Sequence, residues 1–305
     1  MPLTVEVKYA HASVLPDEVV RLLGGCRRVV DCTVGAGGHS RALLDAGAAV
    51  LAIDQDPAAV RAAREALGAR ARVLEAEFGA AARDPEVAEF RPDGVLLDLG
   101  VSSPQLDDPS RGFTFRPGAP LDMRMTGVGR TAGAWLNEEP EAELARAFAD
   151  HGDEPRARSL ARAVVRRRAR APFATSDDLV GAIREVLGPR SGPPEFARLF
   201  QAVRIAVNDE VARLAAALEA FRDVLAPGGL LVVISYHSGE DRVAKHAFRE
   251  WSRSCVCPRE QPLCTCRGRA LGELVTKRAV RPGAAETAAN PRARSARLRA
   301  FRKAP

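Results

Sequence analysis

Short apolar runs alternate with amphipathic stretches over the first hundred residues. The runs at residues 27–30, 49–54, 72–78 and 94–100 are apolar over most of their length, as buried strands of a parallel sheet are. Residues 41–47, 57–67 and, more weakly, 80–90 carry apolar side chains at helical spacing. This alternation predicts a βαβαβ sheet covered by helices, with its ligand site at the carboxyl ends of the strands.

The pattern then changes to helices without strands, and later changes back. Helical periodicity is found at residues 141–150, 156–170 and 176–187. The α/β pattern resumes with one long helix over 196–225. After it the pattern predicts a strand at 230–236, a helix at 240–251 and a closing strand pair within 272–280 and 295–302. We therefore expect a discontinuous domain of residues 1–105 and 198–305, interrupted by a helical domain at 106–197.

The chain carries a formal net charge of +6, and this charge is unevenly distributed. Residues 267–305 hold eleven Lys and Arg against two Glu, so the rest of the chain is mildly acidic. A basic end favours a nucleic-acid partner, although a merely solvated tail is the simpler alternative. No apolar run approaches the ~20 residues of a membrane span, and residues 1–10 lack a signal pattern, so we expect a cytoplasmic protein without membrane contact.

A glycine-rich turn follows the first predicted strand. It reads Asp31-Cys32-Thr33-Val34-Gly35-Ala36-Gly37-Gly38-His39-Ser40. Ser40 occupies the third glycine position of the dinucleotide fingerprint G-x-G-x-x-G, so the turn departs from that motif. Asp31 and Asp54 end the first and second strands. Two strand-end acids around a glycine turn resemble the nucleoside-binding half of S-adenosylmethionine-dependent methyltransferases.

Six ordered motifs extend this resemblance over residues 9–302. They are the glycine turn, Asp98–Asp108, Arg111–Phe115 with Pro120–Met125, Phe200–Asn208, Ile234–Arg242 and Asn290–Ser295. Together they resemble the MraW family, the bacterial methyltransferases that modify cytosine N4 in the decoding region of small-subunit (16S) ribosomal RNA. The resemblance implies an α/β, Rossmann-like class I methyltransferase with a mostly parallel seven-stranded sheet. It also implies S-adenosyl-L-methionine as cofactor, and an inserted helical domain that recognises RNA.

The resemblance assigns roles to individual residues. Gly37, Gly38 and His39 would hold the methionine end of the cofactor, and Asp54 would bind the ribose hydroxyls. Phe78 would lie against the adenine, while Asp98 and Gln105 would complete the pocket near the reacting methyl group. The residue pattern itself supports the glycines and Asp54, whereas an aromatic residue at a strand end is more often part of the core.

The catalytic residues depart from a common pattern. Many amino-methyltransferases have Asn or Asp, two prolines and an aromatic residue after the fourth strand, where this chain has Asp98-Leu99-Gly100-Val101. Asp98 is the candidate acceptor for the amine proton, and His237, at the end of the fifth strand, is a second candidate. Glu240 and Asp241 have an equally good explanation as the first turn of a helix. Gly239 stands where the family commonly has leucine.

RNA recognition has several candidates, each with a simpler alternative. Phe113, Phe115 and Tyr236 offer surfaces on which a flipped base could stack, or else belong to the core. The arginine-rich stretch at 162–170 and the basic end would bind phosphates, or else remain solvated. The expected partner is small-subunit ribosomal RNA, either free or in the assembled subunit. The sequence leaves the oligomeric state open, with a homodimer among the options.

Four cysteines form a C-x-C-x6-C-x-C pattern: Cys255, Cys257, Cys264 and Cys266. Four thiolates can bind zinc, but gaps of two residues are commoner in such sites, so we favour reduced thiols and predict no metal in the active site. Disulfides are rare in the cytoplasm. Cys26 and Cys32 are expected in the core.

Two other functions compete with the RNA methyltransferase. A methyltransferase that acts on a small molecule or a protein would not need the basic end. A non-catalytic RNA-binding protein could retain the same fold. Salt-dependent RNA binding without methyl transfer would favour the second of these.

Overall fold

The computed structural model describes residues 13–258, 260–261 and 263–305. The expectations for residues 1–10 lie outside this range. The chain divides into two compact units, one of Met1–Gly100 with Val211–Pro305 and the other of Val101–Glu210. The helical domain expected over residues 106–197 falls inside the second unit. No helix in the described part of the chain is long and apolar enough to cross a membrane.

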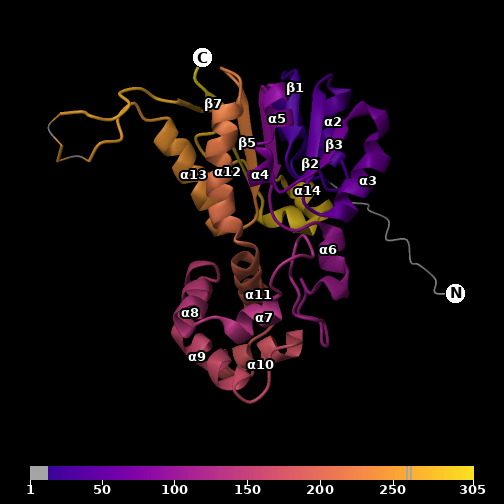
Figure 1. Ribbon diagram of the computed structural model, residues 1–305, viewed down its shortest axis with the longest axis vertical. Coiled ribbons are helices and arrows are strands. Elements are labelled where there is room, and N and C mark those ends of the chain that lie inside the picture. The colour runs from indigo at the N-terminus through magenta and orange to yellow at the C-terminus, as the bar shows by residue number, and fades with distance from the viewer. Residues whose placement is uncertain (1–12, 259, 262) are drawn as a thin grey trace. The chain divides into compact units, whose positions relative to one another are not determined.

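The first unit is built on one twisted sheet (Figure 1). Among the described residues its strand order is β3-β2-β1-β4-β5-β7-β6. The strands are β1 (Arg28–Asp31), β2 (Ala49–Asp54), β3 (Arg72–Glu75), β4 (Gly94–Asp98), β5 (Leu230–Ser235), β6 (Gly272–Leu274) and β7 (Arg297–Lys303). β1 to β5 run parallel, and β7 runs antiparallel to both β5 and β6. The predicted seven-stranded, mostly parallel sheet is therefore confirmed.

Helices cover both faces of this sheet because successive side chains of each strand point to opposite faces. In β1, Val29 belongs to one hydrophobic cluster and Val30 to the other. The first cluster includes side chains of α1, α2 and α3, and the second includes side chains of α5, α12 and α13. The helices of this unit are α1 (Pro16–Leu23), α2 (Gly38–Asp45), α3 (Pro57–Leu67), α4 (Phe78–Ala81), α5 (Pro85–Phe90), α12 (Glu210–Val224), α13 (Ser238–Trp251) and α14 (Ala284–Ala289).

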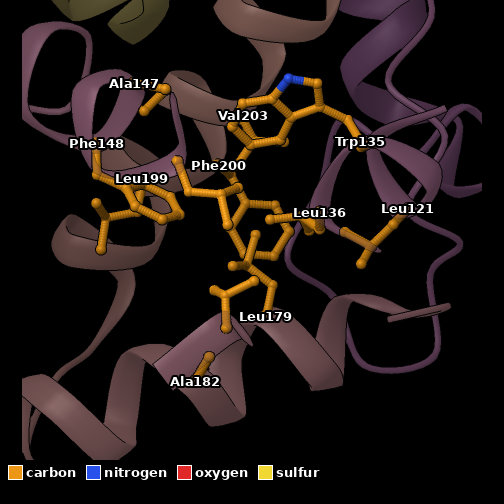
Figure 2. Packing of buried hydrophobic residues seen from close by; sticks show 14 of the residues in the cluster. Leu121, Trp135, Leu136, Ala147, Phe148, Leu179, Ala182, Leu199, Phe200 and Val203 are labelled. Carbon is orange, nitrogen blue, oxygen red and sulfur yellow. The ribbon is translucent and has the colours of Figure 1, made fainter. Parts of the chain in front are cut away.

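The second unit is helical and has a hydrophobic core of its own. Figure 2 shows Trp135, Leu136, Phe148, Leu199 and Phe200 converging in this core. Its helices are α6 (Ser103–Asp107), α7 (Ala132–Glu138), α8 (Glu141–Asp150), α9 (Ala157–Arg168), α10 (Ser176–Leu187) and α11 (Pro193–Asn208). A separate core means that this unit does not depend on the sheet for its own apolar burial.

The long helix predicted over 196–225 is wrong, because it is two helices. α11 ends at Asn208, and Asp209 adopts a left-handed backbone conformation (φ 51°) before α12 begins at Glu210. Asn and Asp tolerate this conformation better than most residues. Asn208 accepts a hydrogen bond from the Met125 N–H and donates one to the Met123 carbonyl, which ties the end of α11 to the preceding loop.

Two smaller predictions are also corrected. The third strand was predicted to reach residue 78, but β3 ends at Glu75 because Glu77 caps α4 through the Ala80 N–H. The weak helix over 80–90 is interrupted by Asp84, whose side chain caps α5. Both breaks follow from acidic side chains that satisfy helix N-termini.

The basic end of the chain is not a free tail. Its closing strand pair is confirmed as β6 and β7, and β7 lies between β5 and β6. Arg297 and Arg299 pair with Asp241 of α13, and the Lys303 ammonium donates to the carbonyls of Asp223 and Leu225. Part of this positive charge therefore stabilises the edge of the sheet.

Candidate functional site

The turn between β1 and α2 is built around glycines and a buried acid. Gly35 and Gly37 have positive φ values of 52° and 82°, which L-residues with side chains adopt rarely. A Cβ on Gly38 would come within 2.1 Å of the Ser13 hydroxyl oxygen. The buried Asp31 carboxylate accepts hydrogen bonds from the Ser40 hydroxyl (2.6 Å) and the Thr33 N–H (3.3 Å). Burial raises the pKa of Asp31, and the Ser40 hydrogen bond opposes that rise.

Asp54 lies at the carboxyl end of β2, beside this turn. One carboxylate oxygen accepts the Gly35 N–H and the other accepts the Asp56 N–H, both at 2.9 Å. Burial raises the pKa of Asp54 to about 6 despite these two bonds. Two donors from different segments fix the orientation of the carboxylate. Each oxygen keeps further lone-pair capacity for a ligand hydroxyl.

Asp98, at the carboxyl end of β4, is the centre of a polar cluster. Its Oδ1 accepts the Tyr236 hydroxyl at 2.8 Å, and its Oδ2 lies 3.4 Å from the His39 Nε2. The Asp98 N–H donates to the Thr33 hydroxyl oxygen at 2.7 Å, which joins β4 to the glycine turn. The sheet thus brings together three residues that lie far apart in the sequence.

The Asp98 carboxylate raises the pKa of both of its side-chain neighbours. Burial lowers the pKa of His39, but the neighbouring Asp98 carboxylate raises it more, so the pKa of His39 lies above its ordinary value. Burial and the same carboxylate raise the pKa of Tyr236, so its hydroxyl stays protonated. His39 is nevertheless buried with its Nδ1 lacking a hydrogen-bond partner among the described residues.

His237 is engaged at the start of α13. Its Nδ1 accepts the Glu240 N–H at 3.4 Å, and its Nε2 lies 3.2 Å from the Glu240 carboxylate. Glu240 in turn accepts the N–H groups of Tyr236 (2.9 Å) and His237 (3.4 Å). Asp241 pairs with Arg299 at 2.6 Å. These side chains cap a helix and tie it to the sheet, which is the structural alternative expected for Glu240 and Asp241.

Two other predicted cofactor residues belong to α4 and α6. Phe78 is the first residue of α4 and is partly buried against the core. Gln105 is buried in α6 of the helical unit, where its Oε1 accepts the Ser102 N–H at 2.9 Å. Phe113 lies in the core of that unit, and Phe115 packs edge-on against Phe196 and Phe200. The roles of Phe78 and Gln105 remain predictions.

Sequence reasoning missed the hydrogen-bond partners of Asp98. Thr33 was not singled out, and Tyr236 was considered only as a stacking surface. The signal for Tyr236 is the pairing of β4 with β5, which sets Asp98 opposite Ile234, two residues before the tyrosine. A tyrosine just past the end of the neighbouring strand can reach such a carboxylate.

A family model described as the MraW methylase family matches residues 8–304. The chain belongs to the MraW methylase family. It is therefore a methyltransferase, and its methyl donor is S-adenosylmethionine.

Three relatives of this chain carry the name ribosomal RNA small subunit methyltransferase H. The protein of Gemmatimonas aurantiaca is 55% identical over 300 residues, which cover 96% of this chain and 95% of the relative. The protein of Thermomicrobium roseum is 47% identical over 282 residues, which cover 90% of this chain and 86% of the relative. The protein of Anaeromyxobacter dehalogenans is 44% identical over 305 residues, which cover 97% of this chain and 98% of the relative. The similarity therefore extends over nearly the full length of both this chain and each relative.

The residues around the glycine turn fit the cofactor of an MraW methylase. Asp54 offers an oriented carboxylate for ribose hydroxyls, and the turn lets a ligand approach the backbone at Gly35, where a Cβ would meet nothing closer than 4.0 Å. The unpartnered His39 Nδ1 is a buried polar atom that a ligand could satisfy. The donor set is thus suited to a nucleoside with a charged, polar extension.

A basic pocket opens beside Tyr236 in the same unit. It is lined by Tyr236, His237, Ser238, Arg281, Arg294, Ser295 and Arg297. Within the described residues, Arg281 and Arg294 have no carboxylate at ion-pair distance, whereas Arg297 lies 3.2 Å from Asp241. Two uncompensated guanidinium groups make this pocket suited to an anionic ligand such as a phosphate.

The arginine-rich helix of the second unit is only partly available for binding. Arg166 and Arg167 both pair with Glu185, and Arg168 donates to the carbonyls of Leu136 and Glu139. Within the predicted stretch 162–170, the exposed arginines for which the described structure shows no ion pair are Arg162 and Arg170. In this stretch, Arg162 and Arg170 therefore remain the candidates for binding phosphates.

Proposed function

We propose that this methyltransferase transfers a methyl group from S-adenosylmethionine to the exocyclic N4 of a cytidine in small-subunit ribosomal RNA, near the decoding site. The observation that carries the proposal is the Asp98 carboxylate, held between Tyr236 and His39 next to the glycine turn. The names of the relatives support the class of RNA.

The cofactor would be held by the residues at the carboxyl ends of β1, β2 and β4. Gly37, Gly38 and His39 would bind its methionine end and Asp54 its ribose, while Phe78 and Gln105 would enclose the adenine and the methyl group. When bound, S-adenosylmethionine supplies a methyl group already activated by a sulfonium centre. The protein therefore has to align the nucleophile and remove a proton.

Asp98 is suited to that task. The cytosine amine is a weak nucleophile because its lone pair is delocalised into the ring. A carboxylate that accepts an amine N–H orients the group and receives the proton released on methylation. Tyr236 remains a hydroxyl donor to Asp98 Oδ1, and His39 lies against Oδ2, so both hold the carboxylate in place. Of the two catalytic candidates, Asp98 is favoured because the His237 Nδ1 already caps α13.

RNA would be bound by separate basic groups. Arg281 and Arg294 line the pocket beside Tyr236, where they can contact phosphates that flank a flipped base. In the helical unit, Arg162 and Arg170 would bind RNA phosphates. The proposal assigns cofactor binding to the unit of residues 1–100 and 211–305 and RNA recognition to the helical unit of 101–210. The sequence-based boundaries, at 105/106 and 197/198, differ from this division by 5 and 13 residues. The proposed substrate is small-subunit ribosomal RNA, either free or in the assembled subunit, in the cytoplasm.

Labelled methyl transfer tests the substrate class. Purified protein and labelled S-adenosylmethionine are incubated with small subunits from cells that lack N4 methylation, with RNA extracted from them, with their proteins, and with large subunits. We expect label in small-subunit RNA, either assembled or extracted, none in the proteins or the large subunits, and no label with Asp98→Ala. Label in protein, or RNA binding without any transfer, would favour one of the two competing functions.

A further inference from the structure

The segment between α13 and β6 is a long loop. Its described residues, 252–258, 260–261 and 263–271, form no helix or strand, and none of their side chains is buried. Figure 1 shows the segment as an orange loop that extends away from α13. A loop of this length without a core needs another source of stability to hold one conformation.

Four thiols nevertheless converge in this loop. The sulfur atoms of Cys255, Cys257, Cys264 and Cys266 all lie within 4.8 Å of one another. The Cys264 sulfur is 3.8 Å from those of Cys255 and Cys257 and 3.4 Å from that of Cys266. A disulfide would need a separation of about 2.0 Å, and all four cysteines are free.

These separations match a tetrahedral metal site. Four sulfurs at ~2.3 Å from a central zinc ion are roughly 3.8 Å from each other. Alternate residues of an extended chain project to the same side, so each C-x-C pair offers two thiols to one point. The Val256 N–H also donates to the Cys266 sulfur at 3.4 Å, a contact that stabilises a thiolate ligand.

We propose that Cys255, Cys257, Cys264 and Cys266 bind one zinc ion, and that this ion holds the loop between α13 and β6 in its fold. The prediction of reduced thiols without metal rested on the short C-x-C gaps alone. Four thiolates around Zn²⁺ carry a doubly negative charge. The loop also contains Arg253, Arg267 and Arg269, of which Arg267 pairs with Glu250. The site lies outside the methyl-transfer residues, so its function is structural.

Metal content tests this proposal directly. The full chain is purified in reductant without chelator, supplied with Zn²⁺, desalted, and analysed by mass spectrometry for metal per chain. We expect one zinc per chain in the wild type and in Cys26→Ser, whose thiol lies elsewhere in the fold, and none in the Cys255→Ser/Cys264→Ser double variant. Substitution by Co²⁺ should give the intense thiolate-to-metal charge-transfer bands of four sulfur ligands.

A second readout follows the loop itself. Trypsin cuts after arginine, and we expect zinc to slow cleavage at Arg253, Arg267 and Arg269 in the wild type at least tenfold but not in the double variant. Circular dichroism checks that both proteins keep the main fold. Zinc below one-tenth per chain after reconstitution, equal zinc in the double variant, or disulfides between these cysteines in the reduced preparation would overturn the proposal.

Discussion

At the scale of single residues, the side-chain contacts of Asp98 make it the candidate proton acceptor. One of its oxygens faces Tyr236, the residue after β5, and the other faces His39 of α2. A carboxylate fixed on both sides loses little rotamer freedom when a substrate binds. Tyr236 is therefore a positioning residue for the proposed proton acceptor.

Tyr236→Phe tests this positioning role. We expect kcat to fall by about 100-fold, at the lower end of general acid–base contributions, because Asp98 itself is retained. The affinity for S-adenosylmethionine and the fold should change little. Steady-state kinetics with small subunits, with calorimetry for the cofactor, separates the two effects. A change in cofactor affinity with kcat preserved would show that Tyr236 shapes the cofactor pocket instead.

Asp54→Asn tests the ribose-binding assignment. Loss of the charge should weaken S-adenosylmethionine binding by about 2 kcal/mol, or roughly 30-fold, because hydrogen bonds to a charged acceptor are the stronger kind. Asp45→Asn, which alters an exposed acid paired with Arg70, is the matched control and should bind normally. Equal affinities of wild type and Asp54→Asn, by calorimetry, would remove Asp54 from the site.

The raised pKa of Asp54 predicts a pH dependence of cofactor binding. Because burial lifts this pKa to about 6, the carboxyl is protonated below that pH and is then a poorer acceptor for ribose hydroxyls. Affinity for S-adenosylmethionine should therefore rise as the pH increases from 5 to 7. The same linkage predicts that this group's contribution to folding stability falls as pH rises from its unfolded pKa towards 6. Both the affinity for S-adenosylmethionine and the free energy of unfolding are measured across this pH range. In the Asp54→Asn variant, the changes that we attribute to Asp54 should be absent from both measurements.

The sequence identifies some of these residues and not others for a physical reason. Gly35, Asp54 and Asp98 can be found because strand ends and positive-φ turns leave local signals. The Tyr236–Asp98 bond joins positions 138 residues apart, and only the strand order reveals it. Gln105 shows the limit of local signals, since its visible partner is the nearby Ser102 N–H.

At the scale of elements, the contact between α13 and β7 closes the sheet edge. Asp241 of α13 faces Arg297 and Arg299 of β7. Burial opposes ionisation of Asp241, but these guanidinium groups lower its pKa below the usual range. The ion pairs therefore stabilise the fold above the ordinary pKa of aspartate, and this stability is lost as the pH falls through the lowered value.

Asp241→Asn should destabilise the protein by about 2 kcal/mol at neutral pH, because it leaves two partly buried cations unpaired. The control is Glu273→Gln, which alters the exposed pair with Arg302 and should change stability by less than ~0.5 kcal/mol. Denaturant unfolding at pH 7 and in acid compares them. Equal stability of the two variants at pH 7 would contradict the structural role of Asp241.

The division of α11 and α12 shows where sequence periodicity fails. Apolar residues at helical spacing continue through Leu214, Leu218 and Phe221, so periodicity alone gives one helix. The break depends on Asn208, whose side chain binds the backbone at Met123 and Met125. That contact is tertiary, and only the adjacent polar pair Asn208–Asp209 hints at it.

At the scale of the whole molecule, the positive charge is divided between structure and binding. Arg297, Arg299 and Lys303 hold the sheet edge, whereas Arg281 and Arg294 line the basic pocket. The charge count of the sequence indicated a polyanion partner but could not separate these two groups, because the distinction depends on which arginines face a carboxylate in the fold.

The double variant Arg281→Gln/Arg294→Gln should weaken RNA binding by about 10-fold to 100-fold. If each arginine contacts one phosphate of single-stranded RNA, the magnitude of the slope of log affinity against log salt concentration should also fall by roughly 1.4. The control removes the same charge elsewhere, with Arg70→Gln and Arg83→Gln. RNA binding measured across a salt series compares the two. Identical slopes in both double variants would place the phosphate contacts outside this pocket.

The most direct test of the proposed reaction is the identity of the methylated nucleoside. Small subunits lacking N4 methylation are treated with the protein and S-adenosylmethionine, and their RNA is digested to nucleosides for mass spectrometry. We predict N4-methylated cytidine from a single position, absent with Asp54→Ala and with Asp98→Ala. A methyl group on carbon 5, on the ribose or on another base would contradict the proposal that this site orients the cytosine amine.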